Sequence, residues 1–138
     1  MAAGDRAKQK ISERAREFIA SAPVPQEPIL SGVQVISGVS RRWALLSPSI
    51  RMFGRPYYVV LTERHVLFCS MSAWTGKPRE IPIVALREQV RVTGARLGGQ
   101  MGWFTCQVPG RDKPMTLRFY RFWRPEVEAL LGALGAAG

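Results

Sequence analysis

The sequence predicts a mainly β fold: a seven-stranded antiparallel barrel or pair of split sheets, capped by a C-terminal α-helix and preceded by an amphipathic helix. The strongest observation is residues 56–71, where two runs of β-branched and aromatic residues flank the polar turn Thr62–His65, as in a β-hairpin. Residues 57–61 are apolar on both strand faces, so this hairpin should lie inside the sheet. The second observation is an apolar helical stripe near the end of the chain, which suits a cap.

The first 22 residues predict a basic amphipathic helix, because Ile11, Ala15, Phe18 and Ile19 recur at helical spacing. The apolar stripe of this helix is narrow and leaves three possibilities. The helix could dock on the domain, pair with a second copy or lie on a membrane surface. Prolines in residues 23–29 then predict a stiff linker, so the main domain is expected at residues 30–135.

The strands follow from apolar alternation and turn signals. Pro82 places its strand at an edge or a bulge, and Gly98 and Gly99 mark a turn. The expected strands are residues 33–39, 56–61, 66–71, 80–85, 90–97, 101–108 and 115–120. The closing helix presents Trp123, Val127, Leu130, Leu131 and Leu134 on one face, with Pro125 near its start. That face should cover the open end and exposed edges of the sheet.

Composition limits the function classes. The 138 residues suit one domain, and 46% hydrophobic with 22% charged residues indicates a globular chain. The net charge of +10 favours an anionic partner, or simply a solvated surface. Cys69 and Cys106 lie in apolar strands and are expected to be buried free thiols, with a disulfide left open. The N-terminus does not resemble a secretory signal, and no apolar stretch is long enough to span a membrane.

The hairpin residues 55–68, Arg-Pro-Tyr-Tyr-Val-Val-Leu-Thr-Glu-Arg-His-Val-Leu-Phe, resemble the corresponding hairpin of bacterial pleckstrin-homology-like (PH-like) domains. The Thr-Gly-x-Pro turn at residues 75–78 and the final strand running into an Ala/Leu-rich helix fit the same family, and the resemblance covers roughly residues 30–134. It implies a bacterial protein that is cytoplasmic, either free or peripheral on the inner face of the membrane. Lipid binding, protein docking and membrane-protein accessory roles are all found in such domains.

The leading functional hypothesis is a membrane-proximal adaptor that contacts anionic lipid through residues 41–55. The resemblance implies a lipid-binding role for this segment, because lipid-binding PH domains hold their headgroup-binding basic residues in the connection between the first two strands. The expected anion-binding residues are Arg41, Arg42, Arg51 and Arg55, and the expected membrane-inserting residues are Trp43, Leu45, Leu46 and Phe53, with Ile50 also apolar. The family's basic-x-basic spacing is absent, since Arg51 and Arg55 are four apart. The structural alternative is that these apolar residues fold back over the hairpin and belong to the hydrophobic core.

Two alternatives and one exclusion complete the hypotheses. Protein interaction or homo-oligomerisation would use the N-terminal helix, the barrel groove or Trp74, Trp103 and Trp123 as anchors. Weak nucleic-acid binding would use a patch of interleaved basic and aromatic residues, although Phe119 and Trp123 are better explained as core. The patch comprises Arg111, Lys113, Arg118, Phe119, Tyr120, Arg121, Phe122, Trp123 and Arg124. No enzyme, cofactor or metal site is expected, because the one histidine, His65, lies in a turn without a nucleophile or ligand pattern.

Overall fold

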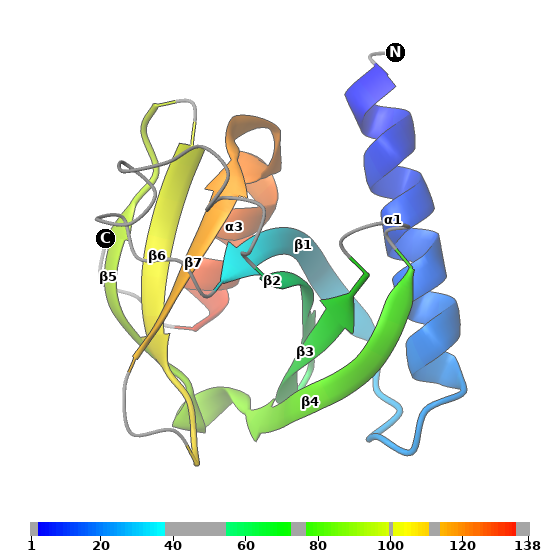
Figure 1. Ribbon diagram of the computed structural model, residues 1–138. Coiled ribbons are helices and arrows are strands. Elements are labelled where there is room, and N and C mark those ends of the chain that lie inside the picture. The colour runs from blue at the N-terminus through cyan, green and yellow to red at the C-terminus, as the bar shows by residue number, and fades with distance from the viewer. Residues whose placement is uncertain (1–2, 38–54, 73–76, 100, 111–113, 135–138) are drawn as a thin grey trace.

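The computed structural model describes residues 3–37, 55–72, 77–99, 101–110 and 114–134 (Figure 1). Within these residues, seven strands and two α-helices form in the expected order, with short 3-10 helices beside β5 and α3. Their bounds are α1 (Ala3–Ala20), β1 (Ile29–Ser37), β2 (Arg55–Thr62), β3 (His65–Met71), β4 (Pro78–Leu86), η2 (Arg87–Gln89), β5 (Arg91–Arg96), β6 (Met101–Gln107), β7 (Met115–Tyr120), η3 (Arg121–Trp123) and α3 (Arg124–Ala133).

The strands form one antiparallel sheet in the order β4-β3-β2-β1-β7-β6-β5. The mainly β prediction is therefore confirmed, but the sheet is not closed, and β4 and β5 form its two edges. The prediction named a barrel or a pair of split sheets, and the structure has one open sheet. Pro78 and Pro82 give a physical reason at β4, because each removes a backbone donor that a further strand would need. A register shift at Pro82 also combines the expected edge with a bulge.

The β2–β3 hairpin lies inside the sheet, as its sequence predicts. Residues 57–62 of β2 and 66–69 of β3 are buried, so both faces of the hairpin are covered. The last paired residues, Leu61 and Val66, leave the four-residue connection Thr62–His65 between them. Because no described non-glycine residue has positive φ, this connection is not a primed turn.

The C-terminal helix packs its apolar face on the domain. Val127, Leu130 and Leu131 are buried and Leu134 is half-buried, which confirms the predicted face. The helix packs against β1 and lies behind β7 in Figure 1. Its end is tied to the rest of the fold by the Arg87 guanidinium, which donates to the carbonyl oxygens of Glu63 and Ala133 at 2.9 and 3.0 Å.

The N-terminal helix docks on its own domain, alongside the β4 side of the sheet in Figure 1. Ala15 and Ile19 are buried, and Ile11 and Phe18 pack partly against the core. The Ser12 hydroxyl lies 2.7 Å from the hydroxyl of buried Tyr58 in β2. Docking, one of the three options that the sequence left open, is therefore the arrangement in the structure.

The connection between α1 and β1 is held by side chains at both ends. The Gln26 amide nitrogen donates to the carbonyl oxygens of Ile19, Ala22 and Val24 at 2.9–3.3 Å, which ties the linker to the end of α1. The next residue, Glu27, hydrogen-bonds to the β2–β3 turn. The Pro-rich segment therefore fixes α1 against the hairpin.

Candidate functional site

The predicted lipid-contacting segment falls almost wholly outside the described residues. Among the expected anion-binding residues, Arg41, Arg42 and Arg51 lie there, as do the expected inserting residues Trp43, Leu45, Leu46 and Phe53. Arg55 is the first residue of β2, and its backbone pairs with Ser37, the last residue of β1. The anchors of the segment are thus adjacent in the sheet, and its function stays a prediction.

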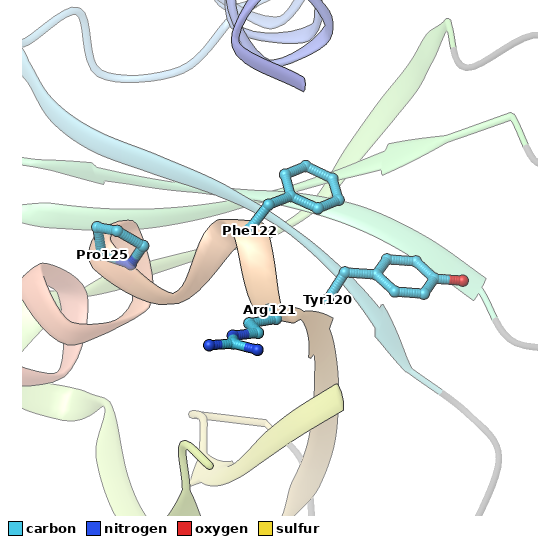
Figure 2. Close-up of a pocket in the computed structure, with 4 residues that line it drawn as sticks. All are labelled: Tyr120, Arg121, Phe122 and Pro125. Carbon is cyan, nitrogen blue, oxygen red and sulfur yellow. The ribbon is translucent and has the colours of Figure 1, made fainter. Parts of the chain in front are cut away.

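A second surface that the sequence singled out is described in full at the junction of β7, η3 and α3. Met115, Leu117 and Phe119 of β7 face the core, so Tyr120 faces out by strand alternation. The chain then turns through η3, which buries Trp123 and leaves Phe122 exposed. Tyr120, Arg121, Phe122 and Pro125 line an open pocket of about 530 Å³ (Figure 2). We call these four residues the Tyr120–Phe122 platform.

The two rings of the platform are nearly parallel and accessible. Their planes are 9° apart and their centroids are 6.2 Å apart. Tyr120 is 51% exposed and Phe122 is 45% exposed, which makes them two of the few large hydrophobic side chains at the described surface. Figure 2 shows both rings extending away from the turn, while the Arg121 side chain runs in another direction. A flat apolar surface of this kind can stack on a planar group or enter an apolar layer.

Basic side chains surround the platform. Arg121 and Arg124 are exposed, and Arg124 pairs with Glu128 at 2.9 Å along the helix. Lys8 reaches the platform from α1: its ammonium lies 5.6 Å from the Phe122 ring centroid and 5.3 Å from that of Trp123. The same ammonium pairs with Glu126 at 3.1 Å. The platform therefore combines apolar rings with the exposed Arg121 and two basic side chains that are in ion pairs.

The sequence located this patch but not its geometry. Phe119 and Trp123 are core residues, as expected, and Tyr120 and Phe122 provide the accessible rings. Arg118 is half-buried, and Arg111 and Lys113 lie outside the described residues. The contribution of Lys8 was missed, because it lies near the opposite end of the chain and nothing in the sequence pairs it with the patch.

The tryptophans proposed as exposed protein-binding anchors do not behave as one set. Trp123 is 1% exposed and touches the Tyr58 ring edge-on at 6.2 Å, so that expectation is wrong for this residue. Trp103 is half-buried on β6, and Trp74 lies outside the described residues. Helix periodicity also predicts Trp123 on the buried face. Burying so large an apolar side chain stabilises the fold more than leaving it exposed as an anchor.

His65 is held by a carboxylate and is not simply solvent-facing. Its Nδ1 lies 3.1 Å from Glu27 Oε2. The other oxygen, Glu27 Oε1, accepts hydrogen bonds from the Thr62 hydroxyl at 2.6 Å and the Arg64 backbone N–H at 3.0 Å. Hydrogen bonding, led by Thr62, lowers the pKa of Glu27 from its ordinary value of 4.5 to about 2. These contacts anchor the linker to the hairpin turn.

Cys69 and Cys106 are both buried, and neither forms a disulfide, as expected. Burial raises the pKa of the Cys69 thiol to about 11. A nucleophilic or metal-binding cysteine normally has a lowered pKa. Among the residues that the structure describes, no group of three His, Cys, Asp or Glu side chains is placed to hold a metal ion.

The comparisons with known proteins leave the resemblance untested. The sequence matches no protein-family model, and no curated protein matches it significantly. Within the described ranges, neither helix combines the length and hydrophobicity required to cross a bilayer.

Proposed function

We propose that the protein is a non-enzymatic PH-like binding module whose Tyr120–Phe122 platform contacts an anionic membrane surface. The observation that carries the proposal is the pair of exposed, parallel rings beside basic side chains in a chain of net charge +10. The antiparallel seven-stranded sheet followed by a packed helix supports the PH-like assignment.

The expected affinity of the platform alone is modest. Complete burial of a large apolar side chain contributes about 1.5 to 3 kcal/mol. Since each ring is already about half buried, inserting both would contribute roughly 1.5 to 3 kcal/mol in total. Each basic residue near an anionic leaflet adds about 1 kcal/mol. Because Lys8 and Arg124 are already in ion pairs, only Arg121 is counted, and the sum is about 2.5 to 4 kcal/mol, a dissociation constant of about a millimolar or weaker. A second contact, such as residues 41–55, would make the attachment durable.

Vesicle sedimentation tests the proposal. We expect retention on phosphatidylcholine vesicles that contain phosphatidylserine, weaker retention on phosphatidylcholine alone, and loss of retention with rising salt. The double variant Tyr120→Ser, Phe122→Ser should reduce retention by at least about tenfold. Val84→Ser, which removes an exposed aliphatic side chain from β4, is the matched control and should have no effect. Equal retention of the wild type on both vesicle types would refute the proposal.

The segment 41–55 is tested separately in the same assay. Trp43→Ser with Leu45→Ser should weaken retention if these side chains insert in the membrane. If they belong to the core instead, the same substitutions should lower the urea midpoint of unfolding. Comparing retention with the urea midpoint therefore separates the membrane hypothesis from the core alternative.

Single-stranded nucleic acid is a second candidate, favoured by the 9° angle between the ring planes. Stacking of bases on aromatic rings contributes about 1 to 3 kcal/mol per base and requires a flat π face. Tyr120→Leu with Phe122→Leu keeps the apolar bulk and removes the flat faces. This variant should retain vesicle binding, whereas a nucleic-acid platform would lose roughly 5-fold to 150-fold in oligonucleotide affinity per ring.

Protein interaction remains the other alternative. The buried positions of α1, Ala15 and Ile19, already pack against this chain's own domain. Pairing of α1 with a second copy through that stripe would first require undocking. Light scattering on the full chain tests this alternative, and a concentration-dependent dimer would favour it over the membrane proposal.

A further inference from the structure

We infer that α1 is part of the binding surface, and that Lys8 is a positioning residue that holds the Phe122 ring in place for its partner. The inference rests on the proposed function and concerns the same platform. It assigns a supporting role to Glu126, a negatively charged residue beside a surface that binds anions.

The position of Lys8 is fixed by three groups. Its ammonium lies 3.1 and 3.2 Å from the two carboxylate oxygens of Glu126 and within cation–π distance of the Phe122 and Trp123 rings. The side chains of Lys8 and Glu126 are 19% and 30% exposed, so the pair is partly shielded from water. Glu126 is in the first turn of α3, where the helix dipole also favours a carboxylate.

The platform needs such support because Phe122 is 45% exposed. A ring that moves freely must be ordered when it binds, and this lowers affinity. Phe122 has Tyr120 beside it, Trp123 at 5.5 Å between centroids, and the Lys8 ammonium at 5.6 Å. Trp123 is itself fixed against Tyr58, whose hydroxyl meets Ser12 of α1. The N-terminal helix thus supports the platform directly through Lys8 and indirectly through Ser12.

Two glutamates on α3 offer a test in which net charge alone and positioning by Lys8 predict different changes in vesicle affinity. Glu126→Gln and Glu128→Gln each raise the net charge by one. Glu128 pairs with exposed Arg124, whereas Glu126 holds Lys8. If net charge alone governs binding to anionic vesicles, both variants should bind more tightly, by up to about fivefold. We expect that increase for Glu128→Gln and unchanged or weaker binding for Glu126→Gln.

Two lysines on α1 provide the reciprocal pair. Lys8→Gln and Lys10→Gln each remove one positive charge, and Lys10 is exposed. We expect Lys8→Gln to lose about fivefold more affinity than Lys10→Gln, and Lys8→Arg to retain most of the wild-type affinity because a cation remains near the rings. Equal losses for the two lysine variants, or equal gains for the two Glu→Gln variants, would overturn the inference.

Ring-proton NMR of Phe122 in the full-length protein gives a readout that does not depend on membranes. Its chemical shifts should change in Lys8→Gln and Glu126→Gln and stay close to wild type in Lys10→Gln and Glu128→Gln. Unchanged shifts in the first two variants would refute positioning by Lys8. If the wild type fails to bind vesicles while these shifts behave as expected, the membrane proposal fails and the positioning role of Lys8 stands.

Discussion

Substitution of Gly32 by alanine should weaken the docking of α1, although Gly32 lies in β1 and not in the helix. A Cβ atom at Gly32 would lie 2.6 Å from Tyr58 Cζ and 2.7 Å from Cε1, and it would also overlap the phenol oxygen. The Tyr58 ring is 3% exposed and its hydroxyl is bonded to Ser12, so it cannot swing into solvent cheaply. The expected result is a displaced ring and a weakened α1 contact.

The magnitude follows from three terms. Overpacking a buried site costs about 1 to 3 kcal/mol, and loss of the Ser12–Tyr58 hydrogen bond costs about 0.5 to 1.5 kcal/mol. Gly32 does not have positive φ, so alanine suits the backbone and returns about 0.4 to 1 kcal/mol by restricting the unfolded chain. The free energy of unfolding should therefore fall by about 0.5 to 4 kcal/mol, measured by urea denaturation.

The chain supplies a control of opposite sign. Gly132 lies in α3, and a methyl group at its Cα would have no neighbouring atom within 4 Å, so Gly132→Ala should stabilise the protein by about 0.5 to 1 kcal/mol. Tyr58→Phe should cost about 0.5 to 1.5 kcal/mol in the wild type. It should cost less in the Gly32→Ala background, where the hydroxyl is already displaced. Wild-type stability of Gly32→Ala, within about 0.5 kcal/mol, would refute the reasoning.

Three further predictions concern the core, the linker and the thiols. Leu130→Ala should cost about 2 to 5 kcal/mol in a urea titration, because the side chain is 1% exposed, while exposed Val84→Ala should stay within about 0.5 kcal/mol. Glu27 has a lower pKa folded than unfolded, so its stabilisation is complete above pH 4.5 and is lost as the pH falls toward 2. The urea midpoint of Glu27→Gln should depend less on pH over that window than the midpoint of the wild type, and parallel pH curves for the two proteins would contradict this. At pH 8, a thiol reagent should modify native Cys69 at least about 100-fold more slowly than the urea-unfolded protein, and equal rates would contradict its burial.

Most of the sheet could be predicted because its strands carry local signals. Alternation placed Met115, Leu117 and Phe119 on the inner face of β7, and the structure buries all three. The β2–β3 hairpin and the buried face of α3 could likewise be predicted from local patterns. Closure of the sheet could not, because pairing of β4 with β5 depends on how the whole sheet bends, which no local pattern encodes.

The site was predicted only in part. Composition marked residues 118–124 as basic and aromatic, and periodicity separated buried Phe119 from exposed Tyr120. The Lys8 contact and the link between Glu27 and His65 join residues far apart in sequence. Lysine and glutamate are ordinary on a solvated surface, so neither pairing left a signal in the residues themselves.

The Lys8–Glu126 pair also has a consequence for the order of folding during synthesis. The two residues are 118 positions apart, so α1 leaves the ribosome long before α3 exists. The strands that α1 contacts, β4 and the Tyr58 strand β2, are made before α3, so α1 can dock on the sheet before the Lys8–Glu126 pair forms. The ion pair between Lys8 and Glu126 is therefore among the last contacts of α1 that can form, and it closes over a helix that the sheet has already received.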